Sequence, residues 1–148
     1  MSTSRVQRLL AEIRDAYDGR PWYGDSLRKT LDGIDEHHAN AKPLPNAHSI
    51  AGLVGHLTAW IEVINRRLDG EVFQVTKGIN FPPPAKWTDQ LKRLDRAHKA
   101  LLQRVSALSD VDLDRRLAGK RHTIEFGVRG VVQHCIYHQG QIGMLMKA

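Results

Sequence analysis

Apolar residues recur every three or four positions along most of this chain, which is the pattern of amphipathic helices. Glycine and proline interrupt the pattern, as in Gly19-Arg20-Pro21 and Asp69-Gly70, and such residues end helices. No strand-like alternation of apolar and polar residues extends over any length. The pattern therefore predicts four long helices: from about Ser4 to Tyr17, from His48 or Ser49 to about Leu68, from Trp87-Thr88 to Leu108, and from about Thr123 to the end of the chain.

The first two long helices are separated by a turn and a short helical piece. Asp25 or Ser26 can cap that piece, since both side chains accept hydrogen bonds from a helix N-terminus. The adjacent aromatic residues Trp22 and Tyr23 are expected to fill the core, although a position over a pocket mouth stays open. Residues 39–47 are polar and rich in proline, so we expect a loop there.

The second and third long helices are joined by a long connection. Residues 71–87 contain Pro82, Pro83 and Pro84 in succession, and such a run cannot lie inside a helix. Thr88 is the expected N-cap of the helix that follows. A charged segment over residues 109–122 is expected to form the last loop.

Four amphipathic helices bury their apolar faces when they pack together as a four-helix bundle. A chain of 148 residues is long enough to build a core and fits one domain. We therefore expect an all-α fold in which residues 1–148 form a single four-helix bundle.

Charge and composition narrow the class of protein. The chain is 41% hydrophobic and 26% charged, with a net charge of +6, as in ordinary globular proteins. Acidic residues are interleaved with the basic ones, so no basic strip resembles a nucleic-acid surface. A solvated basic face is the preferred interpretation of the charge, and an anionic small substrate is the other. No apolar run is long enough for a membrane span, and Met1-Ser2-Thr3-Ser4-Arg5 carries no apolar signal region. We expect a cytoplasmic protein.

The candidate chemistry lies in the last predicted helix. His134 and His138 are four residues apart, one helical turn, so both imidazoles face the same side. His138 falls within the apolar stripe of that helix, and a buried polar group needs a bonding partner. A metal ion would provide one, because a histidine pair at this spacing can offer two ligands to one ion. Two hydrogen-bonded core histidines are the alternative. Cys135, the only cysteine, reads as a small buried residue or a reactive thiol.

Further residues could complete such a site. His56 flanks the apolar stripe of the second helix, at the rim of a core or the wall of a pocket. The side chain of Gln141 leaves the helix in nearly the same direction as that of His134. It can therefore form a hydrogen bond to a substrate or to a group that supports a metal-binding histidine. His98 lies in the stripe of the third helix and is either a core histidine or such an outer partner. No carboxylate is close to the histidines in sequence, which leaves distant candidates for a general base in Asp25, Glu62 and Glu125.

Three stretches resemble motifs of the DinB-like (DinB/YfiT) superfamily. That family's second-helix motif is similar to Val54-Gly55-His56-Leu57 followed by Trp60. Its C-terminal histidine motif is similar to His134-Cys135-Ile136-Tyr137-His138-Gln139-Gly140-Gln141-Ile142. The segment after its first helix is similar to Pro21-Trp22-Tyr23-Gly24-Asp25-Ser26-Leu27. The chain departs from the family at Cys135, where many relatives carry an acidic or amide residue.

The resemblance implies an up-down-down-up four-helix bundle that is often a homodimer. It also implies a divalent metal, zinc or nickel, held by His56, His134 and His138. Trp60, His98 and Gln141 are the candidates for the surrounding pocket. Relatives include thiol-dependent transferases, isomerases and metal-dependent hydrolases. Three imidazoles leave an open metal position, which is typical of catalytic sites. We therefore expect a metal-dependent hydrolase or a thiol-dependent S-transferase acting on a small molecule. The alternative is a non-catalytic metal-binding stress-response protein.

Overall fold

The computed structural model describes residues 2–148, and within that range the fold is all-α. Apart from one isolated bridge between Arg116 and Thr123, this part of the chain contains no β-structure. Its helices are α1 (Arg5–Tyr17), α2 (Leu27–Leu31), α3 (Glu36–Asn40), α4 (Ile50–Leu68), α5 (Lys77–Asn80), α6 (Trp87–Ser106) and α7 (Ile124–Leu145), with a 3-10 turn at Asp112–Asp114.

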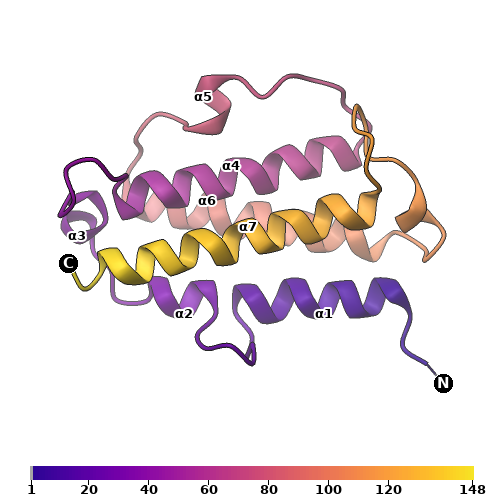
Figure 1. Cartoon of the computed structure of the whole chain (residues 1–148), viewed down its shortest axis with the longest axis horizontal. Coiled ribbons are helices and arrows are strands. Elements are labelled where there is room, and N and C mark those ends of the chain that lie inside the picture. The colour runs from indigo at the N-terminus through magenta and orange to yellow at the C-terminus, as the bar shows by residue number, and fades with distance from the viewer. Residues whose placement is uncertain (1) are drawn as a thin grey trace.

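The four long helices α1, α4, α6 and α7 pack together as the predicted bundle (Figure 1). Side-chain pairs give their directions. Glu62 of α4 pairs with Arg93 of α6, and farther along both helices Asp69 pairs with Arg104, so α4 and α6 run parallel. Helix α7 runs antiparallel to α4 (Figure 1). The topology is up-down-down-up, as the resemblance implied.

Parallel neighbours need a crossover connection between them. Residues 69–86 provide it, and they return along the outside of α4 from the end of that helix to the start of α6 (Figure 1). The sequence predicted an irregular connection here, and the structure adds the short helix α5 within it. Pro83 and Pro84 are exposed and Pro82 is half-buried, which agrees with the predicted position of the prolines outside the helices.

The apolar stripes form the core. Val6, Leu9, Leu10 and Ile13 of α1 are buried, and Val54 and Leu57 of α4 are fully enclosed. Helix starts follow the expected capping chemistry at Ser4, Ser26, Ser49 and Thr123, whose side chains accept backbone N–H bonds. In residues 2–148 we find no helix that combines the length and the apolar character needed to cross a bilayer.

Two local predictions were wrong. Thr88 does not cap α6, because the helix already begins at Trp87, whose backbone N–H donates to the carboxylate of Glu36 at 2.6 Å. Trp22 and Tyr23 do not fill the core, since they are 96% and 42% exposed. Tyr17 and the α2 leucines are buried at this end of the bundle instead. Helix α3, which includes two residues of the predicted 39–47 loop, was not predicted either.

Candidate metal centre

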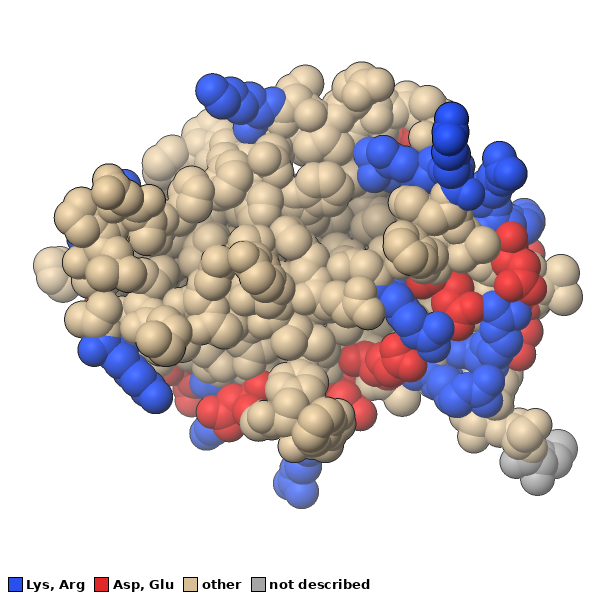
Figure 2. Space-filling model, viewed as in Figure 1, with Lys and Arg blue, Asp and Glu red and all other residues tan. Residues whose placement is uncertain are grey.

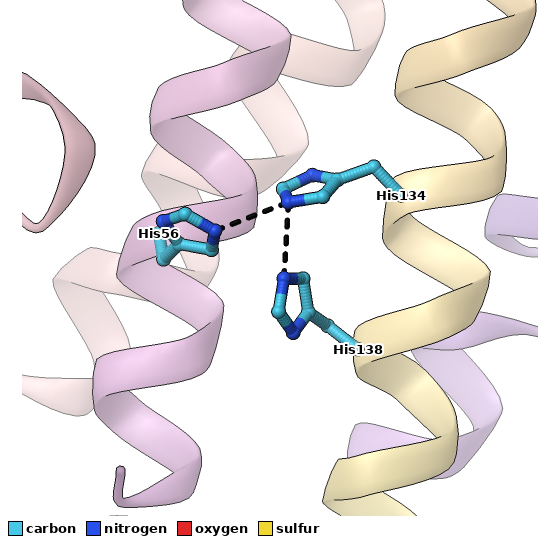
Figure 3. Close-up of side chains that lie close together, drawn as sticks. All are labelled: His56, His134 and His138. Carbon is cyan, nitrogen blue, oxygen red and sulfur yellow. Dashed lines mark hydrogen bonds between the residues drawn. The ribbon is translucent and has the colours of Figure 1, made fainter.

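The three histidines singled out in the sequence lie together between α4 and α7 (Figure 3). His134 and His138 project from consecutive turns of α7, and His56 reaches toward them from α4. His56 and His138 are buried, and His134 is half-buried. Helix geometry places the α7 pair, and the antiparallel packing of α4 against α7 brings His56 opposite that pair.

The imidazoles approach one another through their Nε2 atoms. The Nε2 of His134 lies 3.1 Å from the Nε2 of His56 and 3.0 Å from the Nε2 of His138. One ligand atom from each of the three rings lies within 4.8 Å of the other two. Two nitrogens that each bind one zinc ion at about 2.1 Å are separated by about 3.0–3.4 Å. The observed spacing of the two close pairs therefore fits an ion shared by the rings.

Outer hydrogen bonds fix the tautomers of two of the rings. The Nδ1 of His56 lies 2.6 Å from the carbonyl oxygen of Asn80, and the Nδ1 of His138 lies 2.6 Å from Oε1 of Gln141. Each of these oxygens is an acceptor, so both Nδ1 atoms are donors and carry the proton. In the neutral form of His56 and His138, the Nε2 atoms therefore present lone pairs toward His134. This is the arrangement in which histidines bind metals while an outer group holds the ring.

His134 cannot satisfy both lone pairs that face it. A proton on its Nε2 has two acceptors on different rings, and its Nδ1 is buried without a hydrogen-bond partner among residues 2–148. A cation between the rings accepts all three Nε2 lone pairs at once, which makes a cation the best chemical complement of the cluster.

Burial favours the neutral form of His56 and His134. Burial lowers the pKa of His134 to about 4, and repulsion from His138 and His56 acts in the same direction. Burial also lowers the pKa of His56, against the opposing effect of the Asn80 hydrogen bond. Neutral imidazole is the form that binds metal ions, so these shifts favour metal binding at neutral pH.

The crossover connection builds one wall of the cluster. Phe81 stacks on His56 with ring centroids 4.3 Å apart, and it makes a similar stack with His48. Trp60 donates from Nε1 to Oδ1 of Asn80 at 2.9 Å, and its ring lies 5.9 Å from that of His134. Sequence reasoning missed Asn80 and Phe81 because it treated residues 71–87 only as a connection. The available signal was an aromatic residue held directly before three prolines, which stiffen the chain.

The other candidate residues separate into two groups. Gln141 contacts His138, and Trp60 contacts His134 and lines a cavity of about 360 Å³ beside the cluster. His98 lies elsewhere in the core, where it stacks on Tyr17 with ring centroids 3.6 Å apart. No hydrogen bond within the described chain joins His98 to the cluster. Cys135 is partly buried against the core, and burial raises the pKa of its thiol to about 12, which agrees with a packed apolar residue and not with a reactive thiolate.

Comparison with known proteins gives one match. The sequence model of the DinB superfamily matches residues 22–142, a range that contains all three histidines and Gln141. No curated protein matches the chain at a significant level.

Proposed function

This chain belongs to the DinB superfamily, and we propose that it is a metal-dependent enzyme whose His56, His134 and His138 bind one divalent ion, zinc or nickel. The observation that carries the proposal is the convergence of three Nε2 atoms whose rings are held from the opposite side. When bound, such an ion supplies a Lewis acid that can activate water or a thiol. We propose a hydrolase or a thiol-dependent S-transferase on this basis.

The residues around the cluster have separate tasks in this proposal. Asn80 and Gln141 orient two imidazoles through their Nδ1–H groups. Trp60, Ile64 and Val131 line the adjacent cavity with apolar surface, which limits water near the cluster and holds the apolar part of a substrate.

The carboxylates of Glu62 and Glu125, two of the three considered as general bases, are engaged elsewhere. Glu62 pairs with Arg93, and Glu125 pairs with Arg5 and Arg129. The backbone oxygen of Asp25 accepts from Gln139, and none of the described residues that line the cavity is an aspartate or glutamate. We therefore assign no carboxylate to proton transfer. His122, at the cavity wall, is the ionisable imidazole outside the cluster that a substrate there would meet.

The cavity favours catalysis over the non-catalytic alternative. A structural zinc site is normally closed by four protein ligands, whereas a catalytic site keeps a position for water or substrate. Here three potential ligands lie beside a space of about 360 Å³, which is within the size range of small-molecule sites. We propose a small-molecule substrate for this space.

Metal content is the direct test. Protein purified without an affinity tag should contain about one zinc or nickel ion per chain by elemental analysis. His56→Ala, His134→Ala and His138→Ala should each lose most of it, and His98→Ala should keep it, since His98 lies outside the cluster. Folding of each variant is checked by circular dichroism. A folded His134→Ala protein with full metal content would refute the assignment.

Activity and pH provide the second test. Ester, amide and thiol-conjugation substrates should be screened with the loaded protein, and failure of all three classes would favour the non-catalytic alternative. Protons compete with metal for imidazole. Because the folded pKa values of His56 and His134 are lowered, protons should displace the metal from these two ligands at a lower pH than from ordinary histidines.

A further inference from the structure

A buried arginine without a partner lies in the wall of the cavity beside the cluster. Arg67 of α4 is 6% exposed, and its Nε has no hydrogen-bond partner. Within residues 2–148 no carboxylate lies in ion-pair range of its guanidinium. Its neighbour Arg66, in contrast, binds Glu71 at 2.8 Å. A buried charge without a counter-ion is costly, so the position of Arg67 calls for an anion from outside the described chain.

Arg67 shares a helix face with the cluster. His56, Trp60, Ile64 and Arg67 follow one another at spacings of four, four and three residues, and all four line the cavity. His56 and Arg67 are about three turns apart, or about 16 Å along the axis of α4. The cavity therefore extends from the histidine cluster at one end to Arg67 at the other.

The remaining contacts of Arg67 do not replace an anion. The ring of Phe73 lies 5.4 Å from its guanidinium carbon, a cation–π contact that offers no acceptor for the N–H groups. Arg67 is the only lysine or arginine among the described residues lining the cavity, and most of its neighbours there are apolar. The cavity thus combines one fixed positive charge with an apolar body.

We propose that Arg67 binds the carboxylate of the substrate, whose apolar part lies along Trp60 and Ile64 and whose reacting group lies at the histidine cluster. This proposal rests on the proposed function only in taking the cavity as the active site. Nε is enclosed by the protein, so the two Nη groups of the planar guanidinium are the donors that match the two oxygens of a carboxylate. A single arginine balances one negative charge, so a carboxylate fits better than a doubly charged phosphate ester.

Calorimetric titration with three probes of one chain length tests the proposal. Octanoate, octanamide and octyl phosphate are titrated into wild-type protein, both as purified and after chelation, with metal content measured on each sample. The chelated sample matters because a carboxylate can also bind a metal ion. Octanoate should bind at least about tenfold more tightly than octanamide in both samples, since hydrogen bonds to a charged group are worth that much. Octyl phosphate should bind more weakly than octanoate.

Two variants identify the residue responsible. Arg67→Met should abolish the preference for octanoate over octanamide, and Arg66→Met, which makes the same charge change beside the cavity, should retain it. Arg67→Met removes an unpaired buried charge, so it is expected to fold. Arg67→Gln is a second neutral variant with the same expected loss.

The proposal is overturned if octanoate fails to bind wild-type protein up to millimolar concentration, or binds no better than octanamide. It is also overturned if Arg67→Met or Arg67→Gln keeps the preference, or if octyl phosphate binds more tightly than octanoate. Failure of the metal proposal looks different, because wild-type protein would then lack metal while octanoate binding still depended on Arg67. Full metal content with no dependence on Arg67 would sink the carboxylate assignment alone.

Discussion

His98 should make the folded protein sensitive to mild acid. Its imidazole is 8% exposed and stacked on Tyr17. Burial lowers its pKa from 6.5 to about 4, against the opposing attraction of Asp18 and Asp95. As the pH falls through 6.5, His98 therefore becomes protonated in the unfolded chain while it stays neutral in the folded protein. The unfolded state binds more protons in this window, so the free energy of unfolding falls with pH.

The size of the effect follows from the shift. A lowering of the pKa to about 4, at about 1.4 kcal/mol per pKa unit, removes about 3 kcal/mol of the free energy of unfolding by pH 4. About 2 kcal/mol of this is lost between pH 7 and pH 5. Since small proteins are stable by about 5–15 kcal/mol, the loss is a substantial part of the total.

Urea unfolding at pH 7 and pH 5 measures the effect when wild-type protein is compared with His98→Phe. Phenylalanine keeps an aromatic ring beside Tyr17 and cannot be protonated, so the variant should lose about 2 kcal/mol less between the two pH values. His37→Phe is the matched control, because His37 is exposed on α3. Chelator in all samples removes any contribution of bound metal. Equal pH dependence in wild-type protein and His98→Phe would refute the reasoning.

Two further changes test the cluster and the surface. Gln141→Leu removes the acceptor for His138 Nδ1–H, so metal affinity measured by competition with a chelator should fall about 10–100-fold. The exposed Gln133→Leu should leave affinity unchanged, and an unaltered Gln141→Leu affinity would exclude the orienting role. We also propose a homodimer through the α7 face, where Tyr137 and Met144 are exposed and few charges are present (Figure 2). Sedimentation should give twice the 16.7 kDa chain mass, and Tyr137→Lys should shift the measured mass toward the monomer. Wild-type protein at the monomer mass over a wide concentration range would contradict the proposal.

The parts of this molecule that depend on local chemistry were predictable. Helical spacing alone put His134 and His138 on one side of α7, and serine or threonine caps marked where most helices begin. The apolar stripes identified nearly all of the core. His56 was less certain from spacing, and the resemblance to the superfamily pointed to it more strongly than its position on the stripe.

The parts that depend on distant contacts were not predictable. Thr88 was a reasonable cap from the sequence. The backbone N–H of Trp87, however, donates to the carboxylate of Glu36, which lies 51 residues earlier in the chain. The role of Asn80 rests on its backbone carbonyl, which every residue type possesses, so no sequence pattern could indicate it. The unpaired state of Arg67 likewise appears only when the carboxylates of the other helices are seen to lie elsewhere.

The stacking of Phe81 on His56 links the crossover to the cluster energetically. Amides in this segment, such as that of Phe81, are held only by single-turn bonds like the one to Lys77, so they belong to the part of the fold that opens most readily. A metal ion that rigidifies His56 would also slow hydrogen exchange at these amides. By reciprocity, a partner that rigidifies residues 69–86 would raise the affinity of the cluster for the metal. The connection between α4 and α6 is therefore the place where a binding partner, or a substitution far from the histidines, changes metal affinity without contacting His56, His134 or His138.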